Sequence, residues 1–85
     1  MDQAAKDRRL RWHCRRGMLE LDIFLLNFFD NHYQNLSEED KSLFSDLLAC
    51  NDQDLFVWLT GRENPENEQF ARIATMIRDS HIAAH

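Results

Sequence analysis

The stretch Met18–Tyr33 reads MLELDIFLLNFFDNHY and carries the strongest helical pattern in the chain. Large apolar side chains recur in it every three or four residues, which is the period of an α-helix. They cover more than half of the helix circumference, and a helix of this kind is normally surrounded by other helices. The apolar positions are Met18, Leu21, Phe24, Leu25, Leu26, Phe28 and Phe29. We therefore predict that this stretch forms a central helix.

Start and stop signals on either side of this stretch predict four more helices. Residues 2–15 are expected to form the first helix. Ser37 and Asn51 are residue types that cap helix N-termini, and each is followed by acidic residues and an apolar stripe. Asn64 and Pro65 are expected to begin the fifth helix, with the proline at the first helical position.

The composition of the 85 residues agrees with helices and disfavours strands. Seven β-branched residues stand against eleven leucines and seven alanines, and only two glycines and one proline are available for tight turns. Two cysteines are too few for a disulfide framework, and no apolar run approaches the length of a membrane span. We therefore predict an all-α protein: a compact antiparallel bundle of five short helices, in one cytoplasmic domain over residues 1–85.

Charge changes sign at the joint between the first two predicted helices. Residues 1–16 carry a net charge of +4, residues 17–85 a net charge of −9, and the whole chain a net charge of −5. Gly17 stands at this boundary, where a glycine can end a helix in the left-handed conformation. Arg15 and Arg16 just before it suit the negative end of one helix dipole. The acidic residues after Gly17 are in turn favoured by the positive end of the next helix dipole.

This joint can be interpreted in two ways, and the residues alone favour neither. It can be a well-capped corner between two antiparallel helices with no further role. It can also be a docking site, because Arg16 and Glu20 would present opposite charges from one rigid corner. A guanidinium binds carboxylates or phosphates of a partner through its planar fork. Arg9 lies two turns before Arg16 and is expected to share its face.

The residue pattern supports neither catalysis nor metal binding. His13 and Cys14 are adjacent, so on a helix they point about 100° apart and cannot act as a nucleophile–base pair. His81 and His85 are four residues apart, as two metal ligands on a helix can be, but their place near the chain end favours a tail. We therefore expect no catalytic residue and no metal site.

The basic N-terminal segment leaves a second class of function open. Its arginines surround Trp12, as in helices that lie against phosphates: they are Arg8, Arg9, Arg11, Arg15 and Arg16. The net charge of −9 on residues 17–85 would repel a polyanion, so a solvated basic face is favoured over nucleic-acid binding. A regulatory or nucleic-acid-binding helical module remains the alternative.

The residues of the joint also resemble a known family. The motif R-G-x-x-E at Arg16, Gly17 and Glu20, extended as R-R-G-M-x-E-L-D, is similar to the small flavinylation factors that assemble succinate dehydrogenase. These are the SdhE-type proteins of bacteria and succinate dehydrogenase assembly factor 2 of mitochondria. The likeness continues through Leu36–Lys41 and Cys50–Leu59, and so extends over nearly the whole chain.

This resemblance implies a five-helix bundle that binds the flavoprotein subunit of succinate dehydrogenase and, in bacteria, of fumarate reductase. Such a factor promotes covalent attachment of FAD to that subunit as an assembly chaperone, so we expect no enzyme activity, no stably bound cofactor, no nucleic acid and no membrane insertion. Some bacterial relatives of this kind are described as antitoxins, which makes the alternative an antitoxin-like module. The expected partner-binding residues, with Arg9 added on geometry, are Arg9, Arg16, Gly17, Met18, Glu20 and Asp22.

Overall fold

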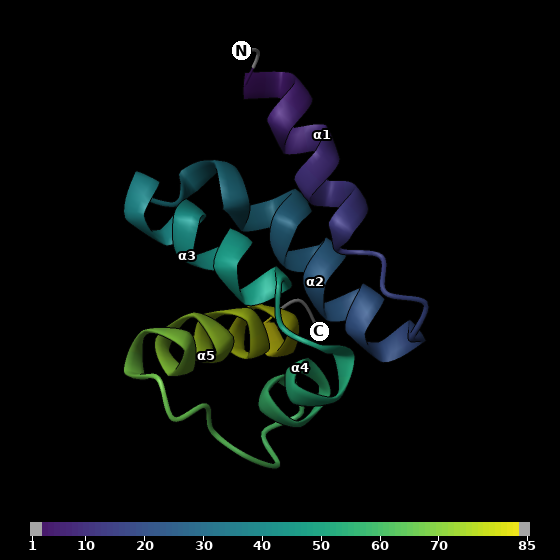
Figure 1. Cartoon of the computed structure of the whole chain (residues 1–85), viewed down its shortest axis with the longest axis vertical. Coiled ribbons are helices and arrows are strands. Elements are labelled where there is room, and N and C mark those ends of the chain that lie inside the picture. The colour runs from purple at the N-terminus through teal and green to yellow at the C-terminus, as the bar shows by residue number, and fades with distance from the viewer. Residues whose placement is uncertain (1–2, 84–85) are drawn as a thin grey trace.

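The computed structural model describes residues 3–83, and every regular element in that range is helical (Figure 1). Five α-helices and one short 3₁₀ turn follow one another: α1 (Gln3–His13), α2 (Leu19–His32), η1 (Tyr33–Asn35), α3 (Glu38–Leu48), α4 (Asp52–Leu59) and α5 (Glu68–Ala83). The predicted all-α class and the five helices are confirmed. Within the same range, no helix is both long and apolar enough to cross a membrane.

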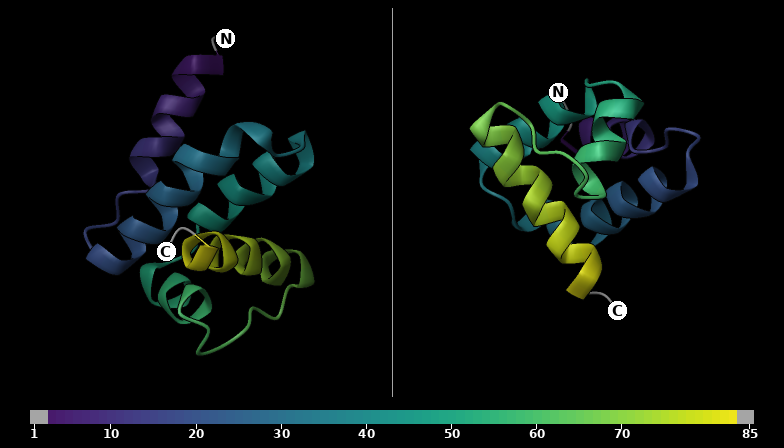
Figure 2. Two further views of the ribbon diagram at one scale, coloured as in Figure 1. Left: turned by 180° about the vertical axis from the view of Figure 1, so that it is seen from behind. Right: turned by 90° about the horizontal axis from the view of Figure 1, so that it is seen from below.

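The first three helices alternate in direction, and α5 runs across them (Figure 1, Figure 2). α2 packs against α4, α5 and η1, while α5 also packs against α3 and α4. A helix that packs against a single neighbour needs only one apolar face. Several elements cover α2, and its apolar surface is correspondingly wider. The prediction that this helix is central is confirmed.

A cluster of aromatic rings ties the end of α2 to α3. The ring centroids of Phe28 and Phe44 lie 5.5 Å apart, and the ring of Tyr33 lies 4.6 Å from that of Phe29 and 5.9 Å from that of Phe44. Tilted and offset ring pairs at such separations contribute more than the buried area alone. Tyr33 belongs to η1, so the cluster also fixes the turn that leads into α3.

Two of the predicted helix starts are confirmed by their hydrogen bonds. The hydroxyl oxygen of Ser37 accepts the backbone N–H of Asp40 at 3.1 Å, at the start of α3. The side-chain oxygen of Asn51 accepts the backbone N–H of Asp54 at 2.8 Å, at the start of α4. Both bonds satisfy donors that have no partner within the first turn of a helix.

The predicted start of the fifth helix is wrong by three residues. α5 begins at Glu68, and the side chain of Asn67 caps it by accepting the N–H groups of Gln69 at 2.8 Å and Phe70 at 3.1 Å. Pro65 is instead buried in the loop between α4 and α5. Two asparagines compete for the cap, and burial of the proline leaves the second of them to begin the helix.

The predicted end of the first helix is also wrong. α1 ends at His13, and Gly17 lies four residues further on, in the connector to α2. The N–H groups of Cys14 and Arg15 bond to carbonyl groups three residues back, at 3.0 and 3.1 Å, which tightens the last turn and closes the helix. Asp2, the expected first residue, lies outside the described range.

Candidate functional site

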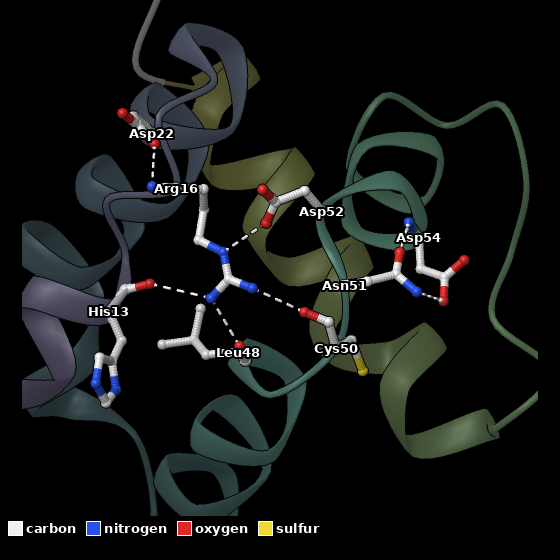
Figure 3. A network of polar contacts seen from close by, with 8 residues as sticks. All are labelled: His13, Arg16, Asp22, Leu48, Cys50, Asn51, Asp52 and Asp54. Atoms are coloured by element: carbon white, nitrogen blue, oxygen red, sulfur yellow. Dashed lines mark hydrogen bonds and ion pairs between the residues drawn. The ribbon is translucent and has the colours of Figure 1, made fainter.

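The connector between α1 and α2 is held in place by the side chain of Arg16 (Figure 3). Its Nε donates to the carboxylate of Asp52 at 2.8 Å, and its Nη2 donates to the carbonyl oxygen of Cys50 at 2.8 Å. Its Nη1 donates to the carbonyl oxygens of Leu48 at 2.7 Å and His13 at 3.2 Å. One guanidinium therefore joins the end of α1 to the connector between α3 and α4.

These contacts explain why an arginine is suited to this position. Leu48 is the last residue of α3, where carbonyl groups lack partners within the helix and the helix dipole favours a cation. The Arg16 side chain is only 17% exposed, so its charge-assisted hydrogen bonds are partly shielded from water. The fork that was expected to face a partner is thus occupied by the protein itself, and Arg16 supports the connector from within.

Asp22 and Gly17 fix the backbone of the same connector. The carboxylate of Asp22 turns back along α2 and accepts the backbone N–H of Arg16 at 2.6 Å. Gly17 has φ +82°, a conformation that residues with a side chain rarely adopt. A Cβ atom added at Gly17 would meet nothing within 4 Å, so any larger side chain would point into open space.

The first turns of α2 present apolar side chains to solvent beside Gly17. Leu19 is 75% exposed and Ile23 is 45% exposed, and their spacing of four places them on one face of the helix. Glu20 is exposed next to them, whereas Met18 is partly buried against the core. We call Gly17, Leu19, Glu20 and Ile23 the α2 corner. Leu19 and Ile23 are not among the predicted site residues, and the signal for them in the sequence is their apolar character off the main stripe of the helix.

A hollow of about 410 Å³ adjoins the α2 corner. Its lining comes from three helices: Glu20, Ile23, Phe24, Leu59, Thr60, Arg78 and His81. Arg78 is turned into the protein, where its Nη1 donates to the carbonyl oxygen of Trp58 at 3.2 Å, and the ring of His81 lies 4.4 Å from that of Phe24. Apolar walls beside the exposed carboxylate of Glu20 suit an apolar side chain that has a cation next to it.

Arg9 lies apart from the other predicted site residues. It lines a second hollow, between α1 and α3, together with Lys6 and His13. Since α1 ends at His13, Arg9 and Arg16 do not share a helix face, and the expectation based on their spacing is wrong. The structure therefore gathers Gly17, Met18 and Glu20 at one corner, with Arg16 and Asp22 beneath it.

The thiol of Cys14 is buried and held in its protonated form. Burial raises the pKa of Cys14 to about 12, and its Sγ donates to the carbonyl oxygen of Leu10 at 3.5 Å. A thiol held protonated in this way is a poor nucleophile. Within residues 3–83, no three side chains of the metal-ligating types come together, and His85 lies outside that range.

A protein-family model described as "Flavinator of succinate dehydrogenase" matches residues 8–81 of this chain. The chain belongs to this family. It is similar to the FAD assembly factor SdhE of Idiomarina loihiensis, with 51% identity over 73 residues that cover 85% of this chain and 81% of the relative. The SdhE of Shewanella oneidensis is 51% identical over 70 residues, covering 82% and 85% of the two chains. That of Aliivibrio fischeri is 37% identical over 83 residues, covering 98% and 96%.

Membership of the flavinator family confirms the resemblance that the motif and its flanks indicated. The match spans α1 from Arg8 onward and reaches His81 in α5, so the α2 corner and both hollows lie mostly within it. The family consists of assembly factors, which agrees with the prediction of a chaperone in place of an enzyme.

Proposed function

We propose that this chain binds the flavoprotein subunit of succinate dehydrogenase and promotes covalent attachment of FAD to that subunit. The observation that carries the proposal is the α2 corner, where two exposed apolar side chains and a carboxylate surround a glycine with open space above it. Exposed apolar groups gathered in this way typically mark a surface that another protein covers. The corner belongs to a chain of the flavinator family, and the description of that family suggests succinate dehydrogenase as the partner.

The chain would act through binding energy. A protein that binds one conformation of its partner more tightly than another shifts the partner toward the first, by as much as the difference in affinity allows. We propose that the flavin and the residue it modifies both belong to the flavoprotein, which this chain holds in a conformation that permits the reaction. FAD would then stay with the flavoprotein throughout.

The residues of the site would divide into contacts and supports. Leu19 and Ile23 would be buried against the flavoprotein. Fully burying an exposed side chain of this size contributes about 1.5–3 kcal/mol, and each of these two would contribute less because it is already partly covered. Glu20 would pair with a cation of the partner, and Gly17 would allow the partner's backbone to come close. Met18, Arg16 and Asp22 would hold these groups in position through the core and the connector.

We place this encounter in the bacterial cytoplasm. Cys14 and Cys50 are free thiols, as is usual for proteins of a reducing compartment. The relatives named above are bacterial FAD assembly factors. The flavoprotein subunit of fumarate reductase, which the resemblance also suggests, serves as a second partner to test.

The proposal predicts that Gly17→Arg abolishes flavin attachment while the helical fold survives. The arginine would point into the open space above the connector and prevent close approach of the flavoprotein. In cells that lack their own factor, in-gel flavin fluorescence of the flavoprotein subunit measures covalent attachment. Gly17→Ala is the matched control, since it shares the strain of the positive φ but adds only a methyl group. Undiminished fluorescence with Gly17→Arg would contradict the proposal.

A further inference from the structure

The second hollow is a basic groove between α1 and α3. Its volume is about 410 Å³, and we call it the α1–α3 groove. One wall is the face of α1 that carries Gln3, Lys6, Arg9, Leu10 and His13. The other is η1 and α3, through Tyr33, Glu38, Lys41, Ser42 and Ser45. Both helices border α2 in Figure 1.

Cations outnumber carboxylates at this groove. Lys6 and Arg9 are exposed, and among the described residues neither has an ion-pair partner. Lys41 faces them from α3, with its Nζ 5.3 Å from the ring centroid of Tyr33 and 4.0 Å from the carboxylate of Glu38. Three cations and one carboxylate line the groove, and Lys41 also interacts electrostatically with the nearby carboxylate of Asp7. Cations therefore outnumber carboxylates at the groove, in a chain whose net charge is −5.

The dimensions of the groove suit a short stretch of extended chain. Lys6 and His13 are seven residues apart on α1, which corresponds to about 10 Å along a helix axis. Three or four residues of extended polypeptide cover that length. The hydroxyl groups of Ser42 and Ser45 follow the opposite wall and can donate hydrogen bonds to carboxylates.

One end of the groove lies beside Arg16, the residue that holds the connector next to the α2 corner. His13 lines the groove, and its carbonyl oxygen accepts a hydrogen bond from Arg16. Ser45 lies one turn before Leu48, whose carbonyl oxygen is bound by the same Arg16 nitrogen. One partner lying against the molecule can thus reach both surfaces.

We propose that the α1–α3 groove binds an acidic segment of the flavoprotein partner, whose carboxylates pair with Lys6 and Arg9 on one wall and Lys41 on the other. The partner is the one named in the proposed function, on which this inference rests. A short acidic segment fits better than a nucleic acid. Residues 17–85 carry a net charge of −9 and would repel a long polyanion, whereas a short segment stays within the groove.

The test compares two charge-reversal variants of equal net charge. Lys6→Glu with Arg9→Glu alters the groove, and Arg8→Glu with Arg62→Glu alters two exposed cations outside its lining. Isothermal titration calorimetry with the purified flavoprotein subunit, at low and high salt, gives the dissociation constants. We expect the groove variant to bind roughly tenfold or more weakly, because its new carboxylates repel the acidic segment. The control should change less than about threefold, through screened long-range charge. Thermal melts followed by circular dichroism check that both variants fold.

Three results would overturn the inference. Equal weakening of both variants would mean that only the overall charge matters, and no weakening in the groove variant would mean that the groove is not contacted. A mobility shift of a short oligonucleotide that is lost in the groove variant alone would assign the groove to nucleic acid. Failure of the proposed function is distinguishable from these, since the unmodified chain would then not bind the flavoprotein at all.

Discussion

At the scale of single residues, Arg16 does two things that a shorter cation cannot. Its fork reaches the carbonyl groups at the end of α3, and its Nε reaches the carboxylate of Asp52 from the α1–α2 connector. The contacts at Leu48, Cys50 and Asp52 connect residues more than thirty positions apart in sequence. The rigidity of a docking corner built on this connector therefore depends in part on the Arg16 side chain.

Replacing Arg16 by lysine is predicted to destabilise the fold by about 1–3 kcal/mol, because several acceptors lose their donors. For a chain of this size each kcal/mol lowers the melting temperature by roughly 4–8 °C. Thermal unfolding followed by circular dichroism measures this loss. Arg15→Lys, at an exposed neighbouring cation, should leave the melting temperature unchanged. Equal melting of the Arg16→Lys variant and the unmodified chain would show that these contacts add no stability.

At the scale of helices, α1 is the element with the weakest attachment. None of its residues is buried, although Leu10 packs against the core. Its polar contacts with α2 and η1 include the ion pair of Arg11 with Asp30 at 2.8 Å and the hydrogen bond from Gln34 to Asp7 at 2.9 Å. Elements held by few buried contacts open at low free-energy cost.

Acid is predicted to loosen α1 before the other helices. The hydrogen bond from Arg11 holds the pKa of Asp30 below its ordinary value of 3.8, and the hydrogen bond from Gln34 does the same for the pKa of Asp7. A carboxyl group whose pKa is lowered by folding stabilises the fold above the unfolded-state pKa, and this contribution is lost as the pH falls through the folded-state pKa. This stabilisation is therefore lost at pH values below about 3.8, which is the ordinary pKa of both carboxyl groups.

Hydrogen exchange of the α1 amides, compared between pH 5 and pH 3 after correction for the intrinsic rates, measures this loosening. Asp30→Asn should remove part of the pH dependence, and Asp79→Asn, at an exposed carboxyl in α5, should not. Equal loss of protection in α1 and α2 would contradict the prediction.

Among the helices, some boundaries can be predicted from the sequence and others cannot. The caps at Ser37 and Asn51 were predictable because a cap is a local contact over three residues. The start of α5 was not, since the choice between two asparagines depends on burial of Pro65 in the folded chain. The inward turn of Arg16 depends on acceptors at Leu48, Cys50 and Asp52, which are distant in sequence. The exposure of Leu19 likewise depends on which faces of α2 the other helices cover.

At the scale of the whole molecule, the opposite charges that are separated along the sequence lie on two different surfaces. The positive segment folds into α1 and forms one wall of the groove, while the α2 corner presents an acidic and apolar surface. The groove reaches as far as His13, whose carbonyl oxygen accepts a hydrogen bond from Arg16 just before Gly17 of the α2 corner. A partner that contacts both would carry an acidic segment and, at a short distance from it, an apolar group beside a cation. This pattern is more selective than either surface alone.

The most direct test of the central claim, that the α2 corner binds the flavoprotein, is site-specific photo-crosslinking. A photoreactive residue replaces Leu19 in one variant and Gln69, exposed at the start of α5, in the other. Each is irradiated with the purified flavoprotein subunit, and the products are separated by mass. We predict a crosslinked product from position 19 and none from position 69. A product from position 69 alone, or equal products from both, would contradict the account.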